Sequence, residues 1–178
     1  MSDSTAARLA RPTDAEAIAR IYNQGIEERI ATFETKPRSA EQIVAMLAER
    51  GDIYPTVVAE RDRQVVAWAG ASTYRSRPCY QGIAEYSVYV DRAARGIGAG
   101  RAVLEALFRA CEERGFWKLV SRIFPENVAS LALCRATGFR VVGVYQRHGK
   151  LDGEWRDTVI VEKLLGEAAQ DDGGTVSD

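Results

Sequence analysis

The sequence predicts a single α+β domain built on a mixed, mostly antiparallel twisted sheet flanked by helices, and three observations support this. Helical patterns cluster between separate runs of strands, whereas a fully parallel sheet needs strict alternation. A glycine-rich passage joins one apolar strand to an amphipathic helix. The chain has 178 residues, with no internal repeat or linker, which suits one hydrophobic core. We expect this domain over residues 1–166 and a disordered tail, rich in Gly and Asp, over 167–178.

Two capping boxes mark the helices expected in the first third of the chain. Thr13-Asp14-Ala15-Glu16 predicts a helix that runs to about Arg29. Ser39-Ala40-Glu41-Gln42 repeats the pattern and predicts a second helix that ends at Gly51. The connection at residues 33–37 is the sort of loop that can cover a substrate.

Runs rich in β-branched and aromatic residues, bounded by turn residues, predict the strands. We expect strands at residues 56–60, 65–74, 82–90 and 117–124, and a late antiparallel pair at 141–147 and 158–165.

The passage Arg95-Gly96-Ile97-Gly98-Ala99-Gly100 follows an apolar strand and opens a helix that ends at Gly115. Glycines allow a ligand close to the backbone, and the first turn of a helix offers unpaired N–H groups to an anion. The pattern is neither a dinucleotide fingerprint, because Val103 replaces the third glycine, nor a Walker A loop. It predicts a pyrophosphate cradle, with a tight strand-to-helix turn as the alternative.

Further along, Asn127-Val128-Ala129-Ser130 opens a short helix that closes at Thr137-Gly138-Phe139. The order is Arg-x-x-Gly-x-Gly, helix, strand, Asn-x-x-Ser, short helix, Gly-Phe. In this order the chain resembles the GCN5-related N-acetyltransferase (GNAT) superfamily from about Ala7 to Leu165. The resemblance implies the GNAT fold.

Within that superfamily the chain is most similar to the group that acetylates phosphinothricin, methionine sulfoximine and arsinothricin. The stretch from Phe116 to Asn127 is most similar to the arsinothricin branch. The segments that carry the likeness to the group are residues 21–23 with 31–34, 74–78, 85–90 and 153–157.

The resemblance implies acetyl-CoA as co-substrate. A backbone N–H of Val88 or Tyr89 would polarise the thioester carbonyl, the glycine passage would hold the diphosphate, and Asn127 and Ser130 would contact the pantetheine arm or its phosphate end. The implied contacts are Val88, Tyr89, Val90, Arg95, Gly96, Ile97, Gly98, Ala99, Gly100, Arg101, Asn127 and Ser130.

Acetyl transfer requires a neutral amine, and an α-amino group titrates near about 8. The resemblance implies that Glu85 is the general base, acting directly or through one water. By residue type alone, Glu85 could instead face solvent or pair with an arginine. Many relatives have a tyrosine at the position of Cys134 and some a histidine at that of Asp152, so the general acid stays open. We expect His148 in a loop or at a strand end, without an inherited role.

Acceptor choice is expected to depend on Arg75 and Arg77, because guanidinium groups bind carboxylate, phosphinate or arsonate oxygens bidentately. A solvated loop with an internal ion pair is the alternative. Phe33 and Glu34 are further candidates for the pocket wall. The tryptophans are expected in the core or in an interface.

Composition restricts the remaining function classes. With 46% hydrophobic and 28% charged residues and a net charge of −1, the chain offers no field that favours nucleic acid. No apolar run reaches membrane-span length, and the N-terminus lacks an apolar signal region. The three cysteines lie far apart and the chain has one histidine, which argues against a metal cluster and fits a soluble, cytoplasmic protein. Relatives are homodimers, so the resemblance implies a homodimer.

The function expected is N-acetylation of the α-amine of a small glutamate-like amino-acid analogue, by direct transfer in a ternary complex. Resistance would follow, because acetylation removes the charge such an inhibitor needs to imitate glutamate. Two alternatives stay open: a GNAT enzyme that acts on a protein N-terminus, a polyamine or an aminoglycoside, and a CoA-binding module without turnover.

Overall fold

A seven-stranded mixed sheet forms the centre of the computed structural model, which describes residues 5–170. Its strand order is β1-β2-β3-β4-β5-β7-β6. Neighbouring strands run antiparallel except β4 and β5, which are parallel, and this confirms the predicted fold class. The strands are β1 (Ala6–Leu9), β2 (Thr56–Arg61), β3 (Gln64–Thr73), β4 (Ile83–Val90), β5 (Lys118–Ile123), β6 (Arg140–Leu151) and β7 (Glu154–Leu164).

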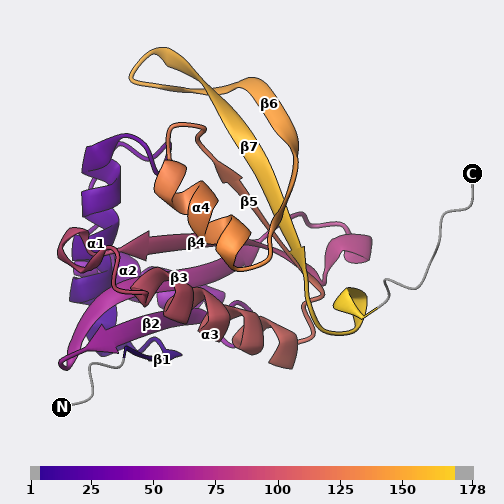
Figure 1. Cartoon of the computed structure of the whole chain (residues 1–178). Coiled ribbons are helices and arrows are strands. Elements are labelled where there is room, and N and C mark those ends of the chain that lie inside the picture. The colour runs from indigo at the N-terminus through magenta and orange to yellow at the C-terminus, as the bar shows by residue number, and fades with distance from the viewer. Residues whose placement is uncertain (1–4, 171–178) are drawn as a thin grey trace, which may run out of the picture.

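Helices cover both faces of the sheet (Figure 1). They are α1 (Ala15–Glu28), α2 (Ala40–Arg50), α3 (Ala99–Glu113) and α4 (Val128–Ala136). Successive residues of a strand face opposite sides, so Val57 joins the core beneath α3 while Val58 joins the core beneath α1 and α2. Trp68 is 2% exposed in the second core, as expected for a core tryptophan.

The first helix starts differently from the prediction. The capping residue of the predicted box, Thr13, lies in a 3-10 turn at Pro12–Asp14 that precedes α1. The N-cap of α1 is Asp14, whose carboxylate makes no cap hydrogen bond to the helix. It accepts instead from Arg8 Nη1 at 2.8 Å and from the Arg11 N–H at 2.7 Å. The hydrogen bond from Arg8 lowers the pKa of Asp14. The box at Ser39 is confirmed, because its Oγ accepts from the Gln42 N–H and the Gln42 side chain accepts from the Ser39 N–H.

The late antiparallel pair is longer than predicted. Strands β6 and β7 meet at Asp152 and Gly153, both with positive φ, in the kind of two-residue turn that Asp-Gly favours. The hairpin rises beyond the rest of the sheet (Figure 1), and it places His148 inside β6, not in a loop or at a strand end. Strand β1 was not predicted.

At the C-terminal end, Gly166–Ala169 form a 3-10 turn, and residues 171–178 of the predicted tail lie outside the described residues. Within the described part, no helix combines the length and the apolar character needed to cross a membrane.

The position of the site follows from how β4 and β5 separate. Their parallel pairing runs from Ile83 with Lys118 to Glu85 with Val120 and goes no further, although β4 stays paired to β3 as far as Val90. The two strands therefore splay apart beyond Glu85. One cavity is lined by both strands here, and a second cavity lies at the end of β4.

Candidate active site

The two cavities share one wall. The glycine cavity, about 370 Å³, is lined by the Arg95–Arg101 passage, and the Glu85 cavity, about 380 Å³, is lined by side chains of β4, β5 and β6. The residues that line both are Ala31, Val88, Tyr89, Asn127 and Ser130. The backbone of β4 beyond Glu85 therefore lies between a main-chain cradle and a side-chain pocket.

The glycine cavity is built around the N-terminus of α3. Gly96 and Gly98 have φ of 80° and 85°, and Gly98 is the N-cap of α3 with no side chain to satisfy the first N–H groups. Gly100 lies in the first turn, where an added Cβ would be 3.0 Å from Leu133 Cδ2. Unpaired N–H groups and the positive end of a fifteen-residue helix thus face the cavity, which suits an anionic diphosphate.

Arg95 is held against the wall of the glycine cavity by Glu28, which also lines it. The Arg95 Nη2 to Glu28 Oε2 distance is 2.8 Å, and Arg92 Nε lies 3.1 Å from Glu28 Oε1. Burial alone would raise the pKa of Glu28, but the hydrogen bonds from Arg95 and Arg92 outweigh it and the pKa is lowered. Arg101 also lines the cavity and pairs with Glu105 at 2.9 Å.

Most of the predicted cofactor contacts lie together. All of them line the glycine cavity except Ile97, which is 39% exposed and lines neither cavity. Asn127 has a structural task as well, because its Oδ1 accepts from the Ser130 N–H at 3.1 Å and caps α4. The two residues are thereby fixed relative to each other.

Glu85 lines the second cavity and also pairs with an arginine, so both interpretations of this residue describe its position. Arg122 Nη2 donates to Glu85 Oε1 at 2.8 Å and to Oε2 at 2.9 Å. On the other side, Arg122 Nη1 lies 3.4 Å from His148 Nε2. The Glu85 side chain is 30% exposed, so the carboxylate stays accessible from the cavity.

Phe33 lines the Glu85 cavity. Its ring packs edge-on against Phe124, with 4.7 Å between centroids, and lies over Gly149, where an added Cβ would be 2.7 Å from Phe33 Cε1. The loop is fastened to α1 because the Asn23 side chain donates to Arg38 O and accepts from the Arg38 N–H. Glu34 does not line either cavity and pairs with Arg38 at 3.2 Å.

The predicted acceptor pair, Arg75 and Arg77, lies outside both cavities in the exposed connection after β3. The Arg75 guanidinium lies 5.2 Å from the Tyr74 ring centroid and 5.9 Å from that of Tyr80. The register pairs Thr73 with Ala84, so this connection leaves the sheet beside the end of β4 that carries Glu85.

Cys134 is buried and lines neither cavity. Its Sγ lies 3.0 Å from Tyr86 Oη, and burial raises the pKa of both groups. Asp152 lies at the hairpin turn, where its Oδ2 is 3.0 Å from Arg29 Nε. Neither Cys134 nor Asp152 lines either cavity.

The sequence predictions missed Arg122, His148 and Gly149, which complete the Glu85 cavity. One signal was available for Arg122, because it is a charged residue inside a strand that reads as buried. His148 and Gly149 carry no such signal, since their approach to Glu85 depends on how far the β6–β7 hairpin extends.

Comparison with known proteins shows the family of this chain. The family model for the acetyltransferase (GNAT) domain matches residues 7–160. A phosphinothricin N-acetyltransferase from Alcaligenes faecalis is 36% identical over 160 residues, which cover 89% of this chain and 81% of that protein.

Solved structures give the same result. A GNAT-superfamily phosphinothricin acetyltransferase from Sinorhizobium meliloti, solved with acetyl-CoA, matches with TM-score 0.84 and 33% identity over 98% of this chain and 92% of that one. A ribosomal-protein-alanine N-acetyltransferase from Brucella melitensis matches with TM-score 0.85 and 34% identity over 89% of this chain and 99% of that one. The chain therefore belongs to the GNAT acetyltransferase family.

Proposed function

We propose that this chain transfers an acetyl group from acetyl-CoA to the α-amine of a small amino-acid analogue, directly within a ternary complex. The observation that carries the proposal is the shared wall at Val88 and Tyr89. On one side lies an anion-binding helix terminus, and on the other an accessible carboxylate, Glu85. A thioester and an amine bound in the two cavities would meet there, which supplies the proximity that acyl transfer needs.

The glycine cavity suits acetyl-CoA. The main chain from Gly96 to Arg101, with Arg95 beside it, would hold the diphosphate, and Asn127 and Ser130 would border the pantetheine arm. When bound, acetyl-CoA supplies the activated acetyl group. A backbone N–H of Val88 or Tyr89 would donate to the carbonyl oxygen, where negative charge develops during attack.

Glu85 would take the proton from the incoming ammonium, directly or through one water. An α-amine with a pKa near about 8 arrives mostly protonated at neutral pH, so this step is required. A thiol with a reference pKa of about 8.5 is a fair leaving group without a protein acid. The position of Cys134, buried beside Tyr86, agrees with departure assisted by water.

The acceptor class we propose is a glutamate-like analogue such as phosphinothricin, methionine sulfoximine or arsinothricin, whose acetylation would confer resistance. Phe33 would cover its aliphatic part. Arg75, Arg77 and Glu34 border the entrance in our proposal, with the arginines facing the distal acidic group. The support for the two arginines is the place where their connection leaves the sheet, beside Glu85. The support for Glu34 is its place next to Phe33 in the loop before α2.

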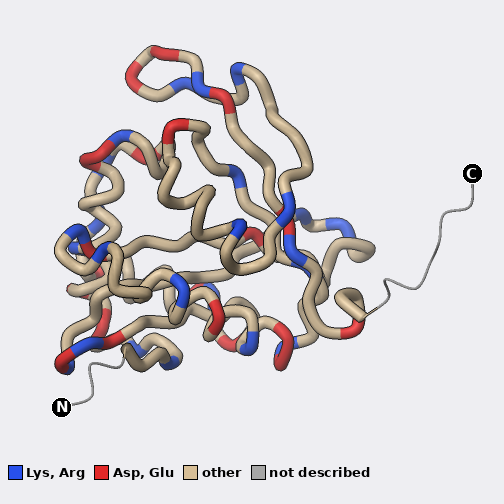
Figure 2. The backbone as a smooth tube through the Cα atoms, viewed as in Figure 1, with Lys and Arg blue, Asp and Glu red and all other residues tan. Residues whose placement is uncertain are grey.

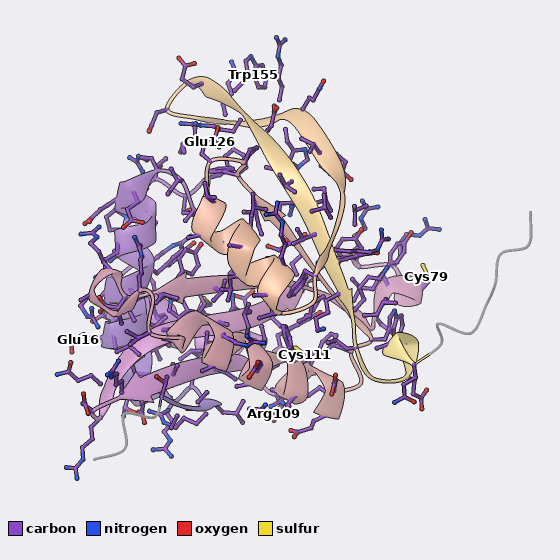
Figure 3. All side chains as sticks on the ribbon, viewed as in Figure 1. Glu16, Cys79, Arg109, Cys111, Glu126 and Trp155 are labelled. Carbon is purple, nitrogen blue, oxygen red and sulfur yellow. The ribbon has the colours of Figure 1, made fainter. Side chains whose placement is uncertain are left out.

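We further propose a homodimer in the cytoplasm. Strand β6 is at the edge of the sheet, and the hairpin exposes apolar side chains that a second copy would cover. These are Val141, Val142, Val144, Tyr145 and Trp155, the last of which is labelled at the far end of the hairpin in Figure 3. The free cysteines Cys79, Cys111 and Cys134 suit a reducing compartment.

A second candidate is acetylation of a protein N-terminus, which the likeness to the ribosomal-protein-alanine acetyltransferase favours. Polyamines and aminoglycosides are weaker candidates, since Lys/Arg and Asp/Glu residues are interspersed along the chain without an acidic tract (Figure 2).

One assay separates these candidates. Purified protein and acetyl-CoA are mixed with phosphinothricin, methionine sulfoximine, arsinothricin, spermidine, an aminoglycoside or an alanine-initiated peptide, and released CoA thiol is measured. The proposal expects the highest kcat/KM among the first three. Highest activity on the peptide would contradict it, and acetyl-CoA binding by calorimetry without thiol release would indicate a binding module.

A further inference from the structure

We propose that Arg122 is a specificity-determining residue that binds the α-carboxylate of the acceptor beside Glu85. The inference rests on the proposed function and deepens it, because it defines the acceptor as a free α-amino acid.

Arg122 and Glu85 have the spacing that an α-amino acid requires. In such an acceptor the amine nitrogen and the carboxyl carbon are only about 2.5 Å apart, as fixed by the bonds around Cα. The Glu85 carboxylate and Arg122 Nη2 are in direct contact at 2.8 and 2.9 Å. When the ammonium of the acceptor pairs with the Glu85 carboxylate, the carboxylate of the acceptor therefore comes within reach of the Arg122 guanidinium. The two charges of the acceptor and the two of the protein then alternate in sign.

Arg122 has donors left for this carboxylate. Glu85 is contacted through Nη2 alone, while Nη1 faces the His148 imidazole at 3.4 Å. A carboxylate accepted along the Nε or Nη1 side leaves the Glu85 contact partly in place. Planar guanidinium is the side chain best suited to bind two oxygens at once.

The charges of the cavity lead to the same conclusion. Among the described residues that line the Glu85 cavity, Arg122 is the one Lys or Arg and Glu85 the one carboxylate. A zwitterionic acceptor offers an ammonium to Glu85 and a carboxylate to Arg122. An amine without a carboxylate has to compete with Arg122 for Glu85. A peptide N-terminus presents a neutral amide at the same place, so Arg122 discriminates against it as well.

The test compares two acceptors that differ at one group, L-methionine sulfoximine and its α-carboxamide. Wild type, Arg122→Met, Arg122→Lys and Arg109→Met are assayed for kcat/KM by thiol release, and acetyl-CoA affinity is measured by calorimetry. Arg109 is the matched control because it is exposed on α3 and lies on the outer side of that helix (Figure 3). Differences in amine basicity between the acceptors cancel when the variants are compared with wild type.

We expect Arg122→Met to lower kcat/KM for the carboxylate acceptor by about 10- to 100-fold, the usual cost of a lost charge-assisted hydrogen-bond pair. The carboxamide should change less than about threefold, with Arg122→Lys intermediate and the control at wild-type values. Unchanged acetyl-CoA affinity shows that the variants are folded.

An equal loss on both acceptors would overturn the inference, since Arg122 would then only position Glu85. A wild type that releases CoA with neither acceptor would refute the proposed function, and this inference with it.

Discussion

The glycine cavity and the Glu85 cavity are neighbours that the chain builds in opposite ways. The glycine cavity comes mostly from one continuous stretch, the end of β4 through the first turn of α3, and offers main-chain groups. The Glu85 cavity brings together β4, β5, β6 and the loop before α2, and offers side chains. A local main-chain site tolerates sequence variation, whereas an assembled side-chain site sets specificity. We therefore expect substitutions to separate cofactor binding from acceptor chemistry.

Glu85→Gln is expected to separate acceptor chemistry from acetyl-CoA binding most strongly. Loss of a positioned general base costs about 100-fold or more in kcat, while acetyl-CoA affinity should stay at the wild-type value because Glu85 does not line the glycine cavity. Steady-state kinetics and calorimetry on the same preparation measure both. The control is Glu126→Gln, since Glu126 is half-exposed and lines neither cavity. A weakened acetyl-CoA affinity in Glu85→Gln would show that the two cavities are not independent.

Gly98→Val is expected to impair acetyl-CoA binding and to spare the acceptor site. A β-branched residue is strained at a φ of 85°, by about 1–2 kcal/mol, and it would shift the N–H groups at the start of α3. Acetyl-CoA should bind about tenfold more weakly, with the KM of the amine little changed. Gly115→Val is the matched control, because Gly115 has a φ of 80° and lies at the other end of α3. Equal weakening in both variants would mean that strain alone is the cause.

A smaller effect, confined to the acceptor, is expected from Gly149→Ala. The new Cβ would overlap the Phe33 ring and displace it from the wall of the Glu85 cavity. We expect the acceptor KM to rise about fivefold, with acetyl-CoA affinity preserved. Gly143→Ala on the same strand has nothing within 4 Å of the added Cβ, so it should match wild type. If the two alanine variants behave alike, Phe33 does not cover the acceptor.

The smallest effect is expected from Glu28→Gln, which removes a carboxylate from the wall of the glycine cavity and releases Arg95. Acetyl-CoA should bind about threefold more tightly. This gain in affinity should shrink at high salt, because the Arg95 side chain is 49% exposed. Glu27→Gln is the control, because Glu27 is 65% exposed and contacts Arg92 at 3.4 Å. If acetyl-CoA binds no more tightly to either variant than to wild type, Arg95 does not reach the diphosphate.

The same contrast explains what could be predicted from the sequence. The α+β class, the helix at Ser39 and the glycine passage depend on neighbours within a few residues, and the structure shows them where the pattern indicated. The capping box at Thr13 was wrong, because Thr13 lies in a 3-10 turn before α1. Asp14 beside it binds Arg8, which lies in a strand that the pattern did not reveal. Arg122 and His148 meet only after β5 and β6 are brought together by β7, which no local pattern encodes.

The most direct test is a crystal structure with CoA and an unreactive acceptor analogue. The account predicts the diphosphate on the N–H groups of Gly96–Arg101, the thiol beside Val88 and Tyr89, and the acceptor nitrogen within hydrogen-bond reach of Glu85. A diphosphate bound elsewhere, or an acceptor nitrogen remote from the Glu85 carboxylate, would contradict it.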